Sequence, residues 1–318
     1  MRLRDMYETA FHAGMAADPR GADGVGRVLA EARKDLEELP EAKRWEFDQE
    51  RLVNPFADTR ILYGDPETEV SSILVGIDLE VGEVLLADRL REKGLPVDLM
   101  FAHHPEGRAL ARLDEVMGVQ ADVWSKFGVS VAYGDAVMSD RMAEIMRALH
   151  PRNNERTVQA ARLLGIPYMC CHTPADNSVN AFLQARCDEL GADGTVDELL
   201  DMLKSIPEYR QAVIEGMGPT IFEGSAKRRT GKIMVDMTGG TSGPVDSLGK
   251  LAAAGVGTIV GMHMGEDHRK RAKEEKIAVV IAGHVSSDSL GMNLIIDQFE
   301  GQGVATIACS GFTRVSRL

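Results

Sequence analysis

The feature that most constrains the fold is a regular alternation between short apolar runs and longer stretches of helical periodicity. Runs of strand length lie at 70–79, 97–104, 129–135 and 167–173, and others lie at 231–240, 256–264, from 277 and at 304–310. Between them, apolar residues recur at helical spacing or charged residues predominate. This alternation predicts an α/β protein whose helices cover mixed or mainly parallel sheets.

The length of the chain, 318 residues, favours two lobes over one. Residues 1–65 predict an N-terminal helical extension, because they are rich in charge, show helical spacing and end near a turn-forming stretch at 63–69. We expect a first α/β lobe over 66–225, completed by 277–318, and a second α/β lobe over 226–276.

Composition narrows the class of protein. The formal net charge of −13 argues against general nucleic-acid or anionic-membrane binding. The sequence has no apolar stretch long enough to span a membrane and no signal-peptide pattern at its start. None of its four cysteines forms a CxxC pair, and we expect a reduced, cytoplasmic protein.

Metal-competent side chains follow three of the predicted strands. They are His103 and His104 in "AHHP", His172 and Asp176 in "CCHTPADN", and His284 and Asp288 in "AGHVSSDS". Open α/β sheets build their sites at the carboxyl ends of strands, so these three strand ends are expected to converge.

Each motif taken alone also has an ordinary structural interpretation. The paired histidines could lie in a surface loop, Asp176 could cap the helix that follows, and Ser287 or Asp288 could cap another. Together they offer four imidazoles and two carboxylates, a set that can ligate two divalent ions such as Zn²⁺, Mn²⁺, Fe²⁺ or Ni²⁺. The other histidines are expected to be solvated or packed: His12, His150, His263 and His268.

In this order, the motifs resemble those of the NIF-three-like family, whose members bind a dinuclear metal centre and some of which carry the label GTP cyclohydrolase I type 2. The matching segments are "DLMFAHHP" (98–105), "HTPAD" (172–176) and "GHVSSD" (283–288). The resemblance covers residues 66–300 and is specific as a set. It implies a two-lobed NIF-three-like fold with the site in the cleft, and homo-oligomers, often toroidal hexamers.

The resemblance also implies roles for individual residues. The metal ligands would be His103, His104, Asp176, His284 and Asp288, with Asp288 as the bridging carboxylate. His172 would be a ligand or would orient one. Two departures stand out: the family usually has Glu where this chain has the shorter Asp288, and its compact members lack a counterpart to the N-terminal extension.

Three functions are compatible with these residues. The first is a metal-dependent hydrolase that acts on a small anionic substrate, such as a nucleotide or another phosphate compound, through activated water. The second is a non-catalytic metal-binding scaffold or regulatory oligomer. The third, a sugar-phosphate or nucleotide-binding protein with an incidental metal, depends only on the glycine-rich "TGGTSGP" (238–244).

Overall fold

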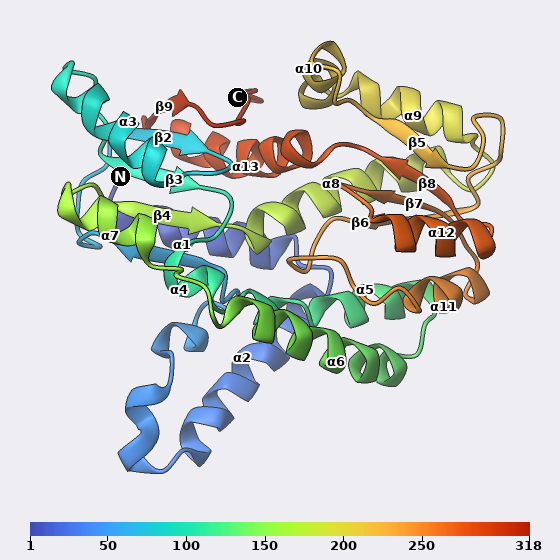
Figure 1. Cartoon of the computed structure of the whole chain (residues 1–318), viewed down its shortest axis with the longest axis horizontal. Helices are drawn as coiled ribbons and strands as arrows, with labels where there is room; N and C mark the ends of the chain where they lie inside the picture. Colours follow the sequence, from blue (N-terminus) through green and yellow to red (C-terminus); the bar gives the residue numbers. More distant parts are fainter.

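The computed structural model describes residues 1–318 and contains two sheets (Figure 1). The first has the strand order β1 (Thr59–Tyr63), β4 (Tyr168–Cys171), β3 (Leu99–Ala102), β2 (Ser72–Gly76) and β9 (Ala305–Ala308). The second has the order β5 (Thr220–Glu223), β8 (Ala278–Ile281), β7 (Val256–Gly261) and β6 (Lys232–Asp236). In each sheet one edge strand, β1 or β5, is antiparallel and the other pairings are parallel.

Helices cover both sheets, so the predicted α/β class with mixed sheets is confirmed. The helices are α1 (Leu3–Ala16), α2 (Gly21–Glu38), α3 (Val81–Glu92), α4 (Gly107–Leu110), α5 (Val119–Phe127), α6 (Val131–Leu149), α7 (Arg156–Leu163), α8 (Thr173–Leu190), α9 (Val196–Ser205), α10 (Pro207–Ile214), α11 (Ser247–Ala253), α12 (Glu266–Glu274) and α13 (His284–Glu300). Short 3₁₀ helices lie at Glu41–Glu46, Gln49–Leu52 and Leu113–Val116.

Helices α8 and α13 form the layer between the two sheets. Helix α8 contributes Ala175 to the core against the first sheet and Val179 to the core against the second. Helix α13 contributes Ile295 to the first of these cores and Leu290 to the second. Because each helix is packed on two sides, its position relative to both sheets is fixed.

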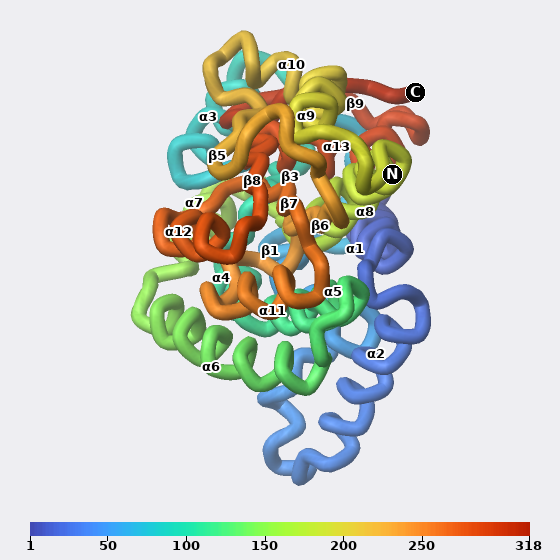
Figure 2. Tube along the Cα trace, turned by 90° about the vertical axis from the view of Figure 1, so that its right-hand side faces the viewer, coloured from blue at the N-terminus to red at the C-terminus, as the bar shows by residue number.

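The outer faces of the sheets are covered by different parts of the chain. Helices α3 and α7 contribute to the core on the outer face of the first sheet, and α5, α6, α11 and α12 to that of the second. Figure 2 shows α5, α6 and α11 together below the second sheet.

Side-chain amides on α8 also bond the free edge of β6. Gln184 accepts a hydrogen bond from the Val235 amide at 2.9 Å and donates one to the Ile233 carbonyl at 3.1 Å. Asn180 accepts one from the Met237 amide at 3.1 Å. An edge strand would otherwise present unpaired backbone groups, so α8 both closes this edge and ties it to the first sheet.

The predicted N-terminal helices are present, and the first of them is packed into the body of the protein. The apolar face of α1, with Leu3, Met6, Ala10 and Phe11, is buried in the core of the first sheet, and β1 is part of that sheet. Only α2 and the following 3₁₀ segment project from the body (Figure 1). Asp48 anchors this segment through Arg60 of β1, at 2.9 Å.

The sheets also divide the rest of the chain differently from the predicted lobes. Strand β8 lies in 277–318, which we assigned to the first lobe, yet it pairs in the second sheet, as does β5. Helices α5 and α6 precede the predicted second lobe but pack on its sheet. The chain passes between the lobes more often than a division at 226 and 277 allows.

One predicted strand, at 129–135, is wrong, because α6 begins at Val131. Within seven residues the apolar pattern suits either element, but over the whole helix Tyr133, Val137, Met142 and Ile145 recur every three to five residues on the face that packs. The predicted strand at 167–173, with buried Cys170 and Cys171, is confirmed, and all four cysteines are free thiols. No helix is both long and apolar enough to cross a bilayer.

The contact between α8 and α13 leads to a stability prediction. A Cβ at Gly291 of α13 would overlap the Ala175 carbonyl of α8. We expect Gly291→Ala to lower the free energy of unfolding by about 1–3 kcal/mol, the usual cost of overpacking. Gly26 of α2 has no atom within 4 Å of its added Cβ, so Gly26→Ala should be stabilising by about 0.5–1 kcal/mol. Urea denaturation of both variants measures the contrast, and equal effects would argue against a tight crossing.

Candidate metal centre

The paired histidines lie where the chain leaves β3. The His103 amide donates to the Gly76 carbonyl at 3.0 Å and the His104 amide donates to the Ile77 carbonyl at 2.9 Å. The chain after β3 therefore stays hydrogen-bonded to the chain at the end of β2 for two more residues. The two imidazole rings nevertheless lie on one side, with centroids 5.0 Å apart. The chain therefore leaves strict strand alternation here, which lets both histidines face one cleft.

The second motif lies at the junction of β4 and α8. His172 is the residue before the helix, and Asp176 is in its first turn. The Asp176 amide bonds the His172 carbonyl at 3.0 Å, so the turn holds both side chains on one face. The alternative interpretation, in which Asp176 caps the helix that follows, does not hold, because the helix has already begun at Thr173.

The third motif lies at the start of α13. Gly283, which precedes the helix, has a φ of 115°, and a Cβ there would be only 3.0 Å from the Met217 carbonyl, so this turn requires glycine. His284 and Asp288 are the first and fifth residues of the helix and share a face, as their spacing predicts. Ser287 and Asp288 are within the helix and do not cap it.

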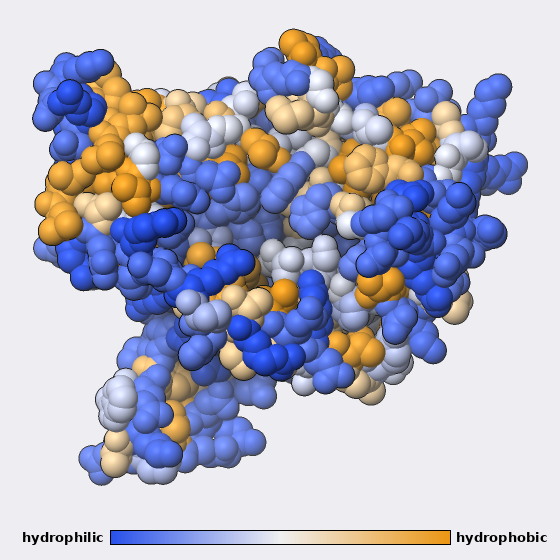
Figure 3. Space-filling view, viewed as in Figure 1, coloured by the Kyte–Doolittle hydropathy of each residue, from blue (hydrophilic) through white to orange (hydrophobic).

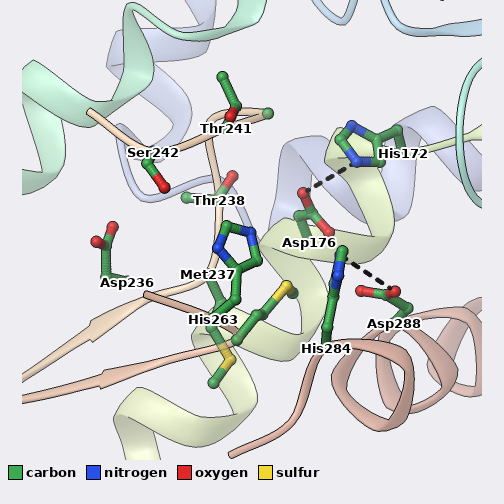
Figure 4. A pocket seen from close by; sticks show the side chains of 12 residues that line it. His172, Asp176, Asp236, Met237, Thr238, Thr241, Ser242, His263, His284 and Asp288 are labelled. Carbon is green, nitrogen blue, oxygen red and sulfur yellow. Dashed lines mark ion pairs between the residues drawn. The ribbon is translucent and has the colours of Figure 1, made fainter. Parts of the chain in front are cut away.

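All six predicted residues converge on one cluster. The Nε2 atom of His103 lies 3.5 Å from an oxygen of Asp176 and 3.5 Å from an oxygen of Asp288. The Nε2 atoms of His104 and His284 lie 3.7 and 3.5 Å from the other oxygen of Asp288. Figure 4 shows the His284–Asp288 pair, and the second carboxylate pairs with His172 at 3.8 Å.

These separations suit atoms that share an ion better than atoms that bond each other. They exceed the usual hydrogen-bond length. Two ligand atoms about 2.1 Å from one ion at a tetrahedral angle lie about 3.4 Å apart. Ligand atoms within 4.8 Å of one another form three sets: His103, His104 and His172; His104, His284 and Asp288; and His103, Asp176 and Asp288.

Further groups contact the imidazoles at Nδ1, the ring nitrogen that does not face the carboxylates of Asp176 and Asp288. Asp78 bonds His104 Nδ1 at 2.6 Å, Asp58 bonds His172 Nδ1 at 2.8 Å, and the Cys171 carbonyl lies 3.2 Å from His103 Nδ1. Such contacts place a proton on Nδ1 and, where the imidazole is neutral, leave Nε2 free to ligate. Asp58 also accepts a bond from the Thr173 hydroxyl at 2.6 Å.

Sequence reasoning missed both outer carboxylates. Asp78 follows β2 in "VGIDL", so the strand-end rule that found the histidines also applied to it. Asp58 precedes β1, a strand that was not predicted, and no local pattern marks it. His263, expected to be solvated or packed, lies at the end of β7 with its ring centroid 5.0 Å from that of His284.

The residues fit a cation, because four buried ligand atoms here lack any hydrogen-bond partner. They are His103 Nε2, Asp176 Oδ1 and both carboxylate oxygens of Asp288. Asp288 is fully buried and Asp176 is 4% exposed. Buried polar atoms almost always have partners, and buried carboxylates require a cation or donors. A divalent ion would satisfy all four atoms at once.

Burial and neighbouring charges shift the pKa values of the cluster in different directions, so that in the absence of a cation His103 is neutral whereas His172 holds an extra proton that a bound ion would have to displace. Burial lowers the pKa of His103 to about 4, so its imidazole is neutral at pH 7 and able to ligate. Burial on its own would lower the pKa of His172, but the carboxylates of Asp176 and Asp58 outweigh it and raise the pKa to about 9. Burial raises the pKa of Asp176 well above its ordinary value.

The cluster forms one wall of a cleft of about 470 Å³, counting its open mouth. Figure 3 shows this face of the molecule hollowed and mainly hydrophilic between the lobes. The cleft is also lined by residues that follow β6 and β7 of the second sheet, including Thr238, Ser242 and His263 (Figure 4). His104 and His284 are partly exposed, 28% and 43%, whereas the carboxylates are buried, so the cluster is open on one side only.

Comparison with known proteins supports the fold. No protein-family model matches the sequence, and no curated protein matches it. The NIF3 superfamily protein from Sphaerobacter thermophilus superposes with a TM-score of 0.72 and 24% identity, covering 90% of this chain and 98% of that one. HcgD from Methanocaldococcus jannaschii gives a TM-score of 0.47 at 16% identity, covering 89% and 95%. TTHA1606 from Thermus thermophilus gives 0.45 at 16%, covering 82% and 89%.

The chain is therefore an α/β protein with a cleft that holds a buried histidine–aspartate cluster compatible with metal binding. Its fold is that of the NIF3 superfamily protein, and the NIF-three-like fold predicted from the three motifs is confirmed. At this sequence identity the likeness establishes the fold, and the chemistry has to be argued from the cluster.

The two perturbed histidines give a testable titration. In the metal-free protein we expect NMR to follow His172 with a pKa of about 9 and His103 with a pKa of about 4. Asp58→Asn should lower the pKa of His172, because it removes a negative partner at 2.8 Å, and should change His103 less. A His172 pKa close to that of an ordinary histidine in the folded wild-type protein would contradict this arrangement.

Proposed function

We propose that the cluster binds two divalent first-row metal ions that share Asp288. The observation that carries this proposal is the carboxylate of Asp288, whose two oxygens face different sets of imidazoles. Oδ1 is nearest His103, while Oδ2 is nearest His104 and His284. One ion would be held by His103, Asp176 and Asp288, and the other by His104, His284 and Asp288.

The remaining histidine contributes to one ion or orients its ligands. His172 Nε2 faces Asp176 Oδ2, and the ring of His172 lies 4.9 Å from that of His103. The set of nitrogen and oxygen ligands suits Zn²⁺, Mn²⁺, Fe²⁺ or Ni²⁺. The proposal therefore names the ligands and the number of ions, and leaves the element to measurement.

We further propose that the protein is a metal-dependent hydrolase for a small anionic substrate, such as a nucleotide or another phosphate compound. Two ions held here would supply activated water and polarise the bond that is attacked. The support is the one-sided opening of the cluster, since structural metal sites are closed and catalytic sites keep open positions.

The chain's own residues would prepare this reaction. Asp78, Asp58 and the Cys171 carbonyl fix the imidazole tautomers, and the buried floor formed by Asp176 and Asp288 excludes water from the rear of the ligands. The glycine-rich turn at 238–244 forms the opposite wall, where a bound substrate would contact it.

Assembly and location remain predictions from the sequence. We propose a homo-oligomer, with a hexamer as the form the family resemblance implies, and a cytoplasmic location. Light scattering of the purified chain measures the first of these directly.

Metal content and turnover test the proposed function together. We expect two ions per wild-type chain by elemental analysis, about one in Asp176→Ala and in His284→Ala, and neither bound tightly in Asp288→Asn. Hydrolysis of a panel of phosphoesters, nucleotides and cyclic amides should require the metal. Loss of a direct ligand should cost more than the roughly 10–100-fold that changes behind the ligands cost.

His150→Ala provides the matched control, because His150 is exposed at the end of α6 and outside the cluster. This variant should keep two ions and full activity. Two ions without turnover across the panel would favour the scaffold function, and a wild-type chain that takes up no divalent ion would overturn the metal centre itself.

A further inference from the structure

The wall of the cleft opposite the metal cluster contains an acidic residue with no partner. Asp236 is the last residue of β6, and its carboxylate makes no hydrogen bond or ion pair within the chain. Its side chain is exposed to the cleft (Figure 4), and His268 lines the adjoining cavity together with it. It lies across His263 from the metal ligands in Figure 4.

The position of Asp236 makes it part of a continuous binding surface. Asp236, Ser242 and His263 line the metal cleft and also a second cavity that continues from it toward Trp124. The hydroxyl of Ser242 likewise makes no hydrogen bond within the chain, although the nearby Thr238 hydroxyl is bonded to Asn177 at 2.6 Å. A molecule bound at the metals can therefore extend to Asp236 without leaving the cleft.

The charges of the cleft differ between its two ends. No Lys or Arg lines the metal cleft or the second cavity. An anionic group would be neutralised mainly at the metal end, because at the other end the carboxylate of Asp236 would repel it and the basic groups lining the second cavity are the imidazoles of His263 and His268. The free carboxylate is complementary to an N–H donor that carries positive charge.

We propose that Asp236 recognises a cationic nitrogen group, such as an ammonium or amidinium, at the far end of a substrate whose anionic end binds at the metal cluster. This inference rests on the proposed function and narrows its substrate class to small molecules that carry both groups. Asp236 sets specificity and takes no part in the bond-breaking step.

A homologous series of synthetic ligands tests the proposal by binding, without turnover. The probes are ω-aminoalkyl phosphonates with two to six methylenes, each paired with the alkyl phosphonate that ends in methyl instead of ammonium. Calorimetry on the metal-loaded full chain measures both. At one or two chain lengths the amine should bind about tenfold or more tightly than its alkyl pair, the usual effect of a charge-assisted hydrogen bond.

Asp236→Asn should reduce this preference to less than about threefold and leave the affinity for alkyl phosphonates unchanged. Asp236→Ser provides a second variant in case the amide disturbs folding. Asp246→Asn is the matched control, because Asp246 is an exposed residue of the same lobe outside both cavities, and it should keep the full preference.

The outcomes separate this inference from the proposed function. If alkyl phosphonates bind but the amine has no advantage, or the advantage survives in Asp236→Asn, the Asp236 inference is overturned and the proposed function stands. If no phosphonate binds the metal-loaded protein, the anionic-substrate proposal fails. In that case saturable binding of n-butylamine that Asp236→Asn abolishes would still support the cationic subsite, and its absence would overturn that as well.

Discussion

The close crossing of α8 and α13 is the constraint on which the rest of the structure depends. Each helix begins at the end of a strand in one sheet and packs into the cores of both. Gly291 allows α13 to approach the backbone of α8 at Ala175, next to Asp176. The same contact that joins the two lobes therefore brings together the two carboxylates of the cluster, and the site is built at a tightly packed junction of the fold.

This location has an energetic consequence. Four nitrogen and oxygen atoms of the cluster are buried without partners, and the effective penalty for burying an ion is roughly several kcal/mol even after relaxation. The fold can carry this cost because the surrounding cores hold the helices in place. A cation that binds only the folded state would recover part of it, by about 2.7 kcal/mol at a free concentration one hundred times its Kd. Folding and metal uptake are thus expected to be thermodynamically linked.

Sequence patterns predicted the parts of the fold that are periodic over a long enough window. The parallel strands with full apolar runs and the three strand-end motifs were identified, because burial on both faces leaves a continuous signal. Strands β1 and β5 were not, since edge strands of four or five residues carry little pattern. The interval 129–135 was misassigned because seven residues do not separate a period of 2 from one of 3.6. The candidate site was also predicted in part. The residues that follow strands could be named from the sequence. Asp58 could not, because it lies more than a hundred residues from its partner His172, and no local spacing rule operates over that separation.

The carboxylate at position 288 reaches the imidazoles of the cluster although Asp has a shorter side chain than Glu. The NIF-three-like motif that this segment resembles usually has Glu at this position. On a helix in the same place, a side chain with one methylene less would hold its carboxylate farther from the imidazoles. In this chain the two oxygens of Asp288 still lie 3.5 Å from His103 Nε2 and from His284 Nε2. Gly291 is on the next turn of the same helix and meets the backbone of α8, so the close approach of α13 sets how far the side chain of Asp288 has to reach. Helix position and side-chain length are therefore linked at this site, because a longer side chain at 288 would have to be accommodated in a space whose width the contact at Gly291 sets.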